Sequence, residues 1–291
     1  MASLRDIKKR IQSIENIEKI TKAMKMVSAA KLRQAMKRMR QCMMYTNKIK
    51  QTMSNIIESM SAEDLRKNPI FQIHHEDSLV KIISVTSDRG MCGSFNNSVV
   101  KVLENTITEL QSKDKSVSVI NLGKKSRKKP TTLEKDFFYN IKDSWNSDIL
   151  NLSKTLSDKF LDDYEKGKIH SLYTISNCYK SASVQKVEQK KLLPLDANTG
   201  EVSDDGIEYI FEPSKINVLN SLIPKYLTMC IYQSFLESET SEHSARMIAM
   251  DSATKNANET FALLTLQYNR ARQANITKEL MEIISGAEAL K

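Results

Sequence analysis

The stretch Leu4–Val27, LRDIKKRIQSIENIEKITKAMKMV, decides the fold. Its apolar side chains recur at steps of three and four residues, a spacing that keeps them on one face of a helix and is typical of a coiled-coil seam. No glycine or proline, the residues that most readily end a helix, occurs between Met1 and Asn68. We therefore predict a helix of about 80 to 100 Å that needs a partner beside it. The predicted seam consists of Leu4, Ile7, Ile11, Ile14, Ile17, Ile20, Met24 and Val27.

The same stretch is strongly basic. Residues 1–50 contain 14 Lys and Arg but three acidic residues, a net charge of +11, whereas the whole chain carries +9. A solvated coiled-coil face would explain this charge, and so would a surface that meets an acidic protein, phosphate groups or lipid headgroups. The sequence leaves these alternatives open.

The composition bounds the class of protein. A chain of 291 residues suits one or two domains. No run of 18 apolar residues and no apolar signal core occurs, so we expect no direct membrane insertion. The four cysteines are far apart and form no CxxC, and the histidines form no cluster, so we expect neither a metal site nor a cofactor.

Beyond Asn68 the pattern changes to alternating strands and helices. Residues 79–86 are rich in β-branched side chains and predict a buried strand. Strand, helix, strand, helix and strand in succession predict a small α/β domain with a partly parallel sheet. The expected strands cover residues 79–86, 116–122, 171–177 and 184–193, and the expected helices cover residues 95–111 and 148–164.

The last segment is similar to the first. Glycine and proline are again absent between Pro224 and Gly286, which predicts a second long helix. Pairing the two long helices with each other as an antiparallel coiled coil gives each of them the partner that it needs, and a parallel homodimeric coil is the alternative. The predicted fold is α/β with a long antiparallel coiled coil, in which N- and C-terminal shaft helices (residues 1–68 and 214–291) flank an inserted Rossmann-like foot domain (residues 69–213).

Catalytic chemistry is not indicated. The segment Ser87–Gly93 follows a strand and precedes a helix, where phosphate-binding loops occur, but it matches neither GxxxxGK[ST] nor GxGxxG. A tight turn with a structural Asp88–Arg89 pair is the better interpretation. Cys92 has no base near it in sequence, and neither paired carboxylates nor a triad can be identified. We do not expect the chain to be an enzyme by itself.

Four segments carry a resemblance to a known family. IKKRIQSIENIEKITKAMKMV (Ile7–Val27), SDRGMCG (Ser87–Gly93), SARMIAMDSATKNA (within Glu242–Asn258) and ARQANITKELMEIISGA (Ala271–Ala287) resemble the F-type ATP synthase gamma subunit, in family order. The departure is Ser94, where the family usually has glycine.

The resemblance implies a non-catalytic central rotor shaft. It would turn inside a hexamer of three alpha and three beta subunits and couple proton flow through the c-ring to ATP synthesis or hydrolysis at the beta sites. Its α/β domain would lie at the foot, against the c-ring and the epsilon subunit. The implied location is the cytoplasmic face of the bacterial inner membrane, or the matrix side of the mitochondrial inner membrane for a processed chain.

The resemblance also implies roles for particular residues. Beta-subunit contacts would come from Met24, Lys22, Lys25, Arg246, Arg272, Gln273 and Thr277. The apolar tip around Ile283, Ile284 and Leu290 would lie in a hydrophobic bearing, and Tyr209 and Glu212 would touch the c-ring or epsilon.

Two other classes of protein remain alternatives. A self-associating coiled-coil scaffold would form homodimers and leave the apolar end of the last helix without a purpose. A nucleic-acid-binding coiled coil would use residues 1–50 as a basic arm, but that arm has no aromatic residue before Tyr45 to stack on bases. We therefore expect no nucleic-acid partner.

Overall fold

The computed structural model describes residues 4–61, 63, 65, 68–72, 79–126, 138–141, 148–195 and 211–289. The chain divides into two compact units, each described by itself. The sheet unit consists of residues 31–245, and the two-helix unit combines residues 1–30 with residues 246–291. Two long helices, α1 (Leu4–Glu58) and α5 (Lys215–Ala289), contribute residues to both.

The sheet unit is built on a mixed sheet of alternating strands and crossover helices. The described strands are ordered β3-β2-β1-β4-β5, with parallel pairing from β3 to β4 and antiparallel pairing between β4 and β5. Parallel neighbours need a crossover connection, and helices α3 and α4 lie between successive parallel strands. The bounds are β1 Leu79–Val85, α3 Phe95–Gln111, β2 Val117–Leu122, β3 Phe138–Ile141, α4 Ile149–Glu165, β4 Ile169–Tyr179 and β5 Gln185–Leu193, with a short 3-10 helix η1 at Pro69–Phe71.

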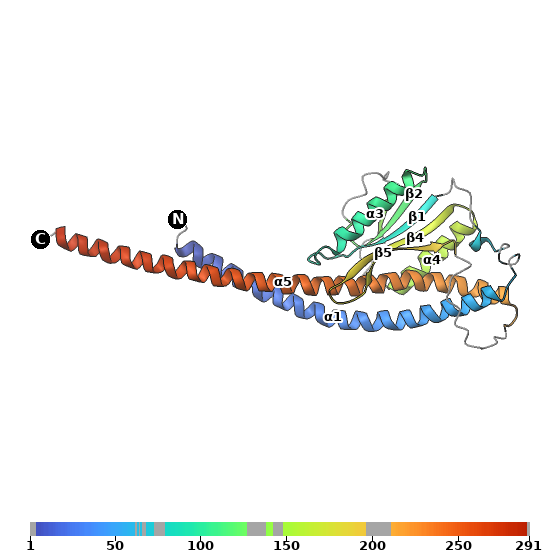
Figure 1. The fold of residues 1–291 in the computed structure, drawn as a ribbon, viewed down its shortest axis with the longest axis horizontal. Coiled ribbons are helices and arrows are strands. Elements are labelled where there is room, and N and C mark those ends of the chain that lie inside the picture. Colours follow the sequence, from blue (N-terminus) through green and yellow to red (C-terminus); the bar gives the residue numbers. More distant parts are fainter. Residues whose placement is uncertain are drawn as a thin grey trace. The chain divides into compact units, whose positions relative to one another are not determined.

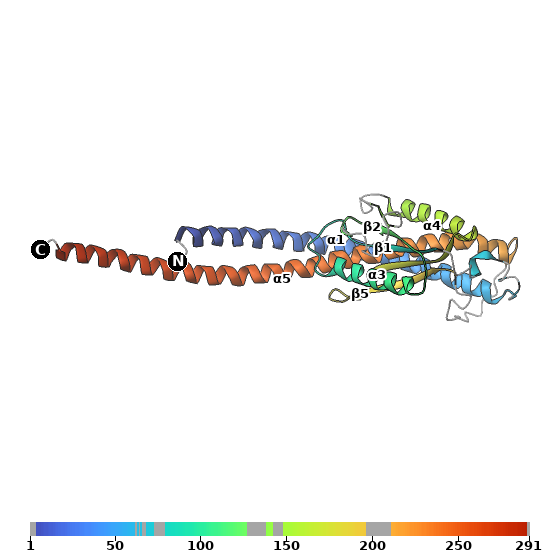
Figure 2. The same ribbon diagram turned by 90° about the horizontal axis from the view of Figure 1, so that it is seen from above.

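Helices cover both faces of this sheet, which explains why β1 and β2 are buried along nearly their whole length. Helix α3 lies on one face, where Val99 and Leu103 pack against Val80 and Ile82 of β1. Helix α4 lies on the other face, and α1 and α5 run side by side there (Figures 1 and 2).

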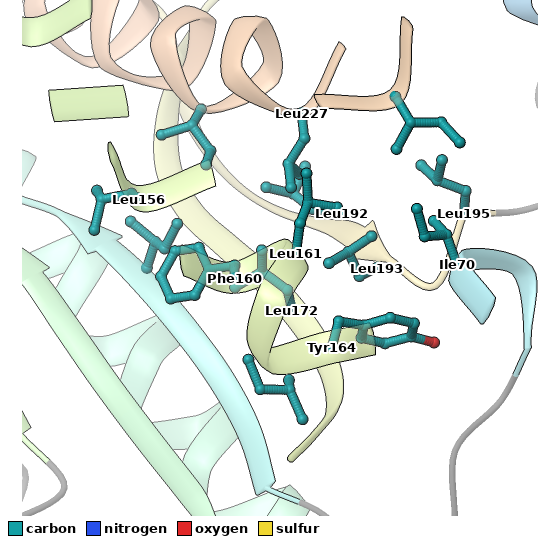
Figure 3. Packing of buried hydrophobic residues seen from close by; sticks show 14 of the residues in the cluster. Ile70, Leu156, Phe160, Leu161, Tyr164, Leu172, Leu192, Leu193, Leu195 and Leu227 are labelled. Atoms are coloured by element: carbon teal, nitrogen blue, oxygen red, sulfur yellow. The ribbon is translucent and has the colours of Figure 1, made fainter. Parts of the chain in front are cut away.

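The larger hydrophobic cluster joins α4, the sheet and the helix pair. Phe160 and Tyr164 of α4 are fully buried, and Leu172 of β4 and Leu227 of α5 belong to the same cluster (Figure 3). The Tyr164 hydroxyl donates to the backbone carbonyl of Gln72 at 2.5 Å, so the polar end of this buried ring is satisfied. This cluster fixes the sheet to α5 over the section from Leu219 to Phe235.

The alternation of strands and helices expected from the sequence is confirmed, including a partly parallel sheet. The helix expected at residues 95–111 coincides with α3, and the other boundaries differ by a few residues. Strand β3 was not expected, because four residues are too few to establish an alternating pattern.

The two-helix unit contains an antiparallel pair. Lys25 Nζ lies 2.5 Å from Asp251 Oδ1, and the Thr254 hydroxyl donates to Thr21 Oγ1 at 2.8 Å. Thr21 precedes Lys25 in α1, whereas its partner Thr254 follows Asp251 in α5. The two helices therefore run in opposite directions. Antiparallel pairing within one chain, the expected arrangement, is confirmed, and the parallel homodimeric coil is not needed.

The predicted seam of α1 was wrong at three positions. Ile17, Ile20 and Val27 are 46%, 59% and 57% exposed. The buried or half-buried side chains of α1 in the two-helix unit are those of Leu4, Ile7, Ile11, Ile14, Glu18, Thr21, Met24, Lys25, Ser28 and Ala29.

The reason for this error is the heptad geometry. From Ile7 to Ile14 the seam advances by alternating steps of four and three, and the same alternation continues at Glu18 and Thr21. Burying Ile17 in place of Glu18 would require α1 to turn about its own axis by one residue, about 100°. The regular helix therefore keeps polar residues inside and leaves an apolar stripe outside.

Helix α5 extends past its partner. Leu4, the first residue of α1, stands as far before Thr21 as Ala271 stands after Thr254. Ala271 is half-buried, and every described side chain from 272 to 287 is exposed. Figures 1 and 2 both show the C-terminal part of α5 running beyond the N-terminus.

Candidate functional surfaces

The unpaired end of α5 carries an apolar face, as the sequence predicted. Ile276, Leu280, Ile283 and Ile284 recur at helical spacing and are 46%, 54%, 68% and 56% exposed. Monomeric proteins rarely leave contiguous apolar surface uncovered, so this face is suited to enclosure by a partner. Leu290, the remaining member of the predicted tip, lies outside the described residues.

Three predicted contact residues begin this unpaired segment. Arg272, Gln273 and Thr277 are exposed. The Thr277 hydroxyl donates to the backbone carbonyl of Gln273 at 3.0 Å, which leaves its oxygen available to accept a hydrogen bond. The structure thus brings these three residues together, next to the apolar face.

The predicted contact residues on α1 differ in their availability. Lys22 has a 65% exposed side chain and lies 4.0 Å from Glu18 Oε1. Lys25 forms its short ion pair with Asp251. The hydrogen bond from Lys25 holds the pKa of Asp251 below its ordinary value, with a further contribution from Lys255. Lys25 therefore neutralises an acidic group of its own chain, and Met24 is half-buried beside it.

An exposed apolar stripe on α1 was missed by the sequence analysis. Ile17, Ile20 and Val27 lie on one side of the helix. The signal was present in the sequence, because a step of three from Ile14 to Ile17 and another to Ile20 interrupts the heptad.

Arg246 is not a surface residue. It is 7% exposed, so it does not offer its guanidinium to an outside partner. Twenty-six residues separate it from Arg272 along α5, about 39 Å of helix. The two-helix unit does not bring these residues together.

One of the two predicted foot-contact residues lies in the part of the chain that the structure describes. Glu212 is exposed and precedes the start of α5, whereas Tyr209 lies outside the described residues. Beside Glu212, the Lys215 ammonium lies 6.0 Å from the centre of the Phe211 ring and donates to the backbone carbonyl of Ser59 at 3.1 Å.

The turn after β1 uses its polar groups to hold its own shape. The Ser87 backbone N–H donates to Asn96 Oδ1 at 2.9 Å, and the Lys124 N–H donates to Asp88 Oδ1 at 2.9 Å. Asp88 therefore accepts a hydrogen bond from the backbone of the segment that follows β2. The sequence had predicted only a pairing of Asp88 with Arg89 and not this contact. Gly123 lets the two loops approach, since a Cβ there would lie 2.1 Å from the Thr86 carbonyl oxygen.

Catalytic and metal chemistry find no support in the described part of the chain. Cys42, Cys92 and Cys178 are buried, and burial raises the pKa of the Cys178 thiol to about 11, which disfavours the nucleophilic thiolate. The described residues contain no group of three or more His, Cys, Asp or Glu that could hold a metal ion. None of the described helices has a stretch long and apolar enough to cross a bilayer.

Comparison with known proteins gives full-length matches. A family model described as ATP synthase matches residues 3–290. The ATP synthase gamma chains of Geobacter sp. (strain M21) and Geobacter metallireducens are 39% and 40% identical to this chain over 297 and 295 aligned residues, and the alignments cover 100% of both partners.

Solved structures have the same fold. A chain of the Euglena gracilis mitochondrial ATP synthase (OSCP/F1/c-ring) is similar with a TM-score of 0.64 at 20% identity, covering 99% of this chain and 94% of that one. A chain of the Tetrahymena thermophila mitochondrial ATP synthase central stalk and c-ring is similar with a TM-score of 0.59 at 24% identity, covering 80% and 99%.

Proposed function

The chain belongs to the ATP synthase gamma chain family, and we propose from this premise that it is the non-catalytic central stalk subunit of a proton-translocating F-type ATP synthase. The observation that carries the proposal is the antiparallel helix pair from which one helix, α5, continues alone with an exposed apolar face. A helix of this kind is suited to a socket formed by other subunits.

The stalk rotates inside the hexamer of alpha and beta subunits. Proton flow turns the c-ring, the ring turns the sheet unit, and the asymmetric helix pair drives the three beta sites through different affinities. The nucleotides and the catalytic groups belong to the hexamer.

Each contact surface has a proposed partner. Ile283, Ile284 and Leu290 occupy the apolar bearing of the hexamer, and Arg272, Gln273 and Thr277 contact a loop of a beta subunit. Met24 and Lys22 meet an acidic segment of beta. Arg246 and Lys25 support these contacts from within the helix pair, because the first is buried and the second is paired.

The foot makes the contacts nearest the membrane. Tyr209 and Glu212 touch the c-ring or epsilon, and the foot domain of residues 69–213 carries them between shaft helices at 1–68 and 214–291. The protein is peripheral and acts at the cytoplasmic face of a bacterial inner membrane, a location supported by the bacterial relatives at 39% and 40% identity.

Reconstitution tests the proposed function. The purified chain is mixed with alpha and beta subunits, and co-elution and ATP hydrolysis are measured. A complex of three alpha, three beta and one copy of this chain, which hydrolyses ATP only when the chain is present, is the expected result. A homodimer that leaves hydrolysis unchanged would instead identify a self-associating scaffold.

A further inference from the structure

Two different kinds of contact fix α5 to the sheet within the sheet unit. From Leu219 to Phe235 the contact is the large hydrophobic cluster. Beyond Phe235, α5 turns a face of short polar side chains toward the β4–β5 hairpin. Ser238, Ser241 and Ser244 are fully buried.

Hydrogen bonds connect this serine face to the hairpin. The Asn177 backbone N–H donates to Ser238 Oγ at 3.2 Å, and the Ser241 hydroxyl donates to the Asn177 carbonyl at 3.3 Å. The Ser244 hydroxyl donates to the Ala182 carbonyl at 2.6 Å. Such short side chains interlock less with the sheet than the large apolar side chains of the cluster from Leu219 to Phe235.

One ion pair with a buried carboxylate crosses the same contact. Lys190 Nζ of β5 lies 3.0 Å from Glu237 Oε2 of α5, and the Glu237 side chain is 4% exposed, whereas the Lys190 side chain is 36% exposed and its ammonium also lies 3.9 Å from Glu188 Oε2. The other carboxylate oxygen, Oε1, accepts from Gln233 Nε2 at 2.7 Å. Burial lowers the pKa of Lys190, but the attraction of Glu237 and the hydrogen bond to it outweigh this effect and the pKa is raised overall, so Lys190 keeps its charge at neutral pH.

An ion pair of this kind, with a buried carboxylate and a partly exposed ammonium, is better explained by geometry than by stability. Desolvation of the two charges offsets much of their attraction, and apolar residues of the same size often stabilise a protein equally well. What apolar residues lack is direction, since a charged hydrogen bond fixes one atom against another. The Lys190–Glu237 pair therefore adds a charged directional contact to the neutral hydrogen bonds by which the serine face positions α5 against the sheet.

We propose that Glu237 and Lys190 are positioning residues for torque transfer, which latch the β4–β5 hairpin to α5 and resist rotation of α5 about its own axis. This role rests on the proposed stalk function, because the load on the latch comes from a ring that turns the sheet unit. When the ring is absent, no torque acts on the Lys190–Glu237 pair.

A charge-reversal cycle in the complete membrane-bound enzyme tests the latch. The variants are Lys190→Glu, Glu237→Lys and the two changes combined, with Lys186→Glu, an exposed residue on the same strand, as the matched control. Each single change should lower proton pumping per ATP hydrolysed by about threefold or more, and the combined change should restore it to within about twofold. Hydrolysis by the complex detached from the membrane should stay within about twofold.

Two results would overturn the proposal. One is a single latch variant that pumps as well as the Lys186→Glu control, and the other is a combined variant that pumps no better than the single ones. A merely structural role predicts loss of assembly and of hydrolysis rather than a changed ratio of pumping to hydrolysis.

If the charged variants do not assemble, Lys190→Met combined with Glu237→Leu provides the same test, since both side chains remain buried without the directional contact. Reduced pumping per ATP supports the latch, and normal pumping refutes it. Failure of the unmodified chain to elicit hydrolysis from alpha and beta subunits would refute the stalk function itself, which separates the two conclusions.

Discussion

Replacing Ile283 and Ile284 with serine should weaken assembly without affecting the fold. The two side chains are 68% and 56% exposed in the chain by itself. Serine and isoleucine have similar helix propensities, so the unpaired part of α5 should remain helical. The free energy of unfolding should change by no more than about 0.5 kcal/mol.

The effect on binding follows from the exposed area. Burying a whole isoleucine side chain contributes about 1.5 to 3 kcal/mol. Roughly two thirds of each side chain is free to be buried in a socket, so the pair contributes about 2 to 4 kcal/mol. At 1.4 kcal/mol per factor of ten, the affinity of the chain for the alpha–beta hexamer should fall roughly 30- to 1,000-fold.

The assay is a titration of the hexamer with the chain, in which the occupied fraction is read from co-elution. Val184→Ser is the matched control, because Val184 is 55% exposed in the turn between β4 and β5 rather than at the tip. Equal affinity for the double variant and the unmodified chain would refute the bearing role. A drop in helical circular dichroism would show that the fold, rather than the contact, had changed.

Three further predictions concern the fold, each measured by urea unfolding of the full chain. Tyr164→Phe should cost about 0.5 to 1.5 kcal/mol, because the hydrogen bond from the hydroxyl to the Gln72 carbonyl is lost. Burial raises the pKa of Tyr164 from 10.0 to about 12, so its stabilisation is complete below pH 10 and is lost toward pH 12, and the unmodified chain should lose more stability over that range than the variant. Ile20→Ser should change the free energy of unfolding by about 0.5 kcal/mol or less. Ile7→Ser, at a buried position of the same helix, should lower it by about 2 to 4 kcal/mol. Equal losses for the two variants would show that Ile20 is buried in the seam. Gly123→Ala should destabilise the sheet unit by more than about 2 kcal/mol, because φ is +113° and a Cβ would collide with the Thr86 carbonyl, and a normal unfolding midpoint would contradict this.

The candidate contacts could be predicted only in part. The apolar face at Ile283 and Ile284 followed from periodicity, whereas its exposure depends on the pairing of Thr21 with Thr254, which leaves the end of α5 without a partner helix. The burial of Arg246 and the pairing of Lys25 with Asp251 could not be predicted from the sequence. The ion pair joins residues 226 positions apart. The latch between Lys190 and Glu237 likewise joins a strand and a helix that have no shared sequence pattern.

The sequence by itself determined the elements whose cause is local. Long segments without glycine or proline became α1 and α5, and β-branched segments before turns became β1 and β2, because backbone preference and periodicity depend on neighbouring residues. Only the tertiary structure decided which face of α1 is buried. The seam passes through Thr21 and excludes Ile20, although Ile20 is the more apolar, because a regular helix cannot rotate locally to bury one residue while its partner holds the heptad on either side.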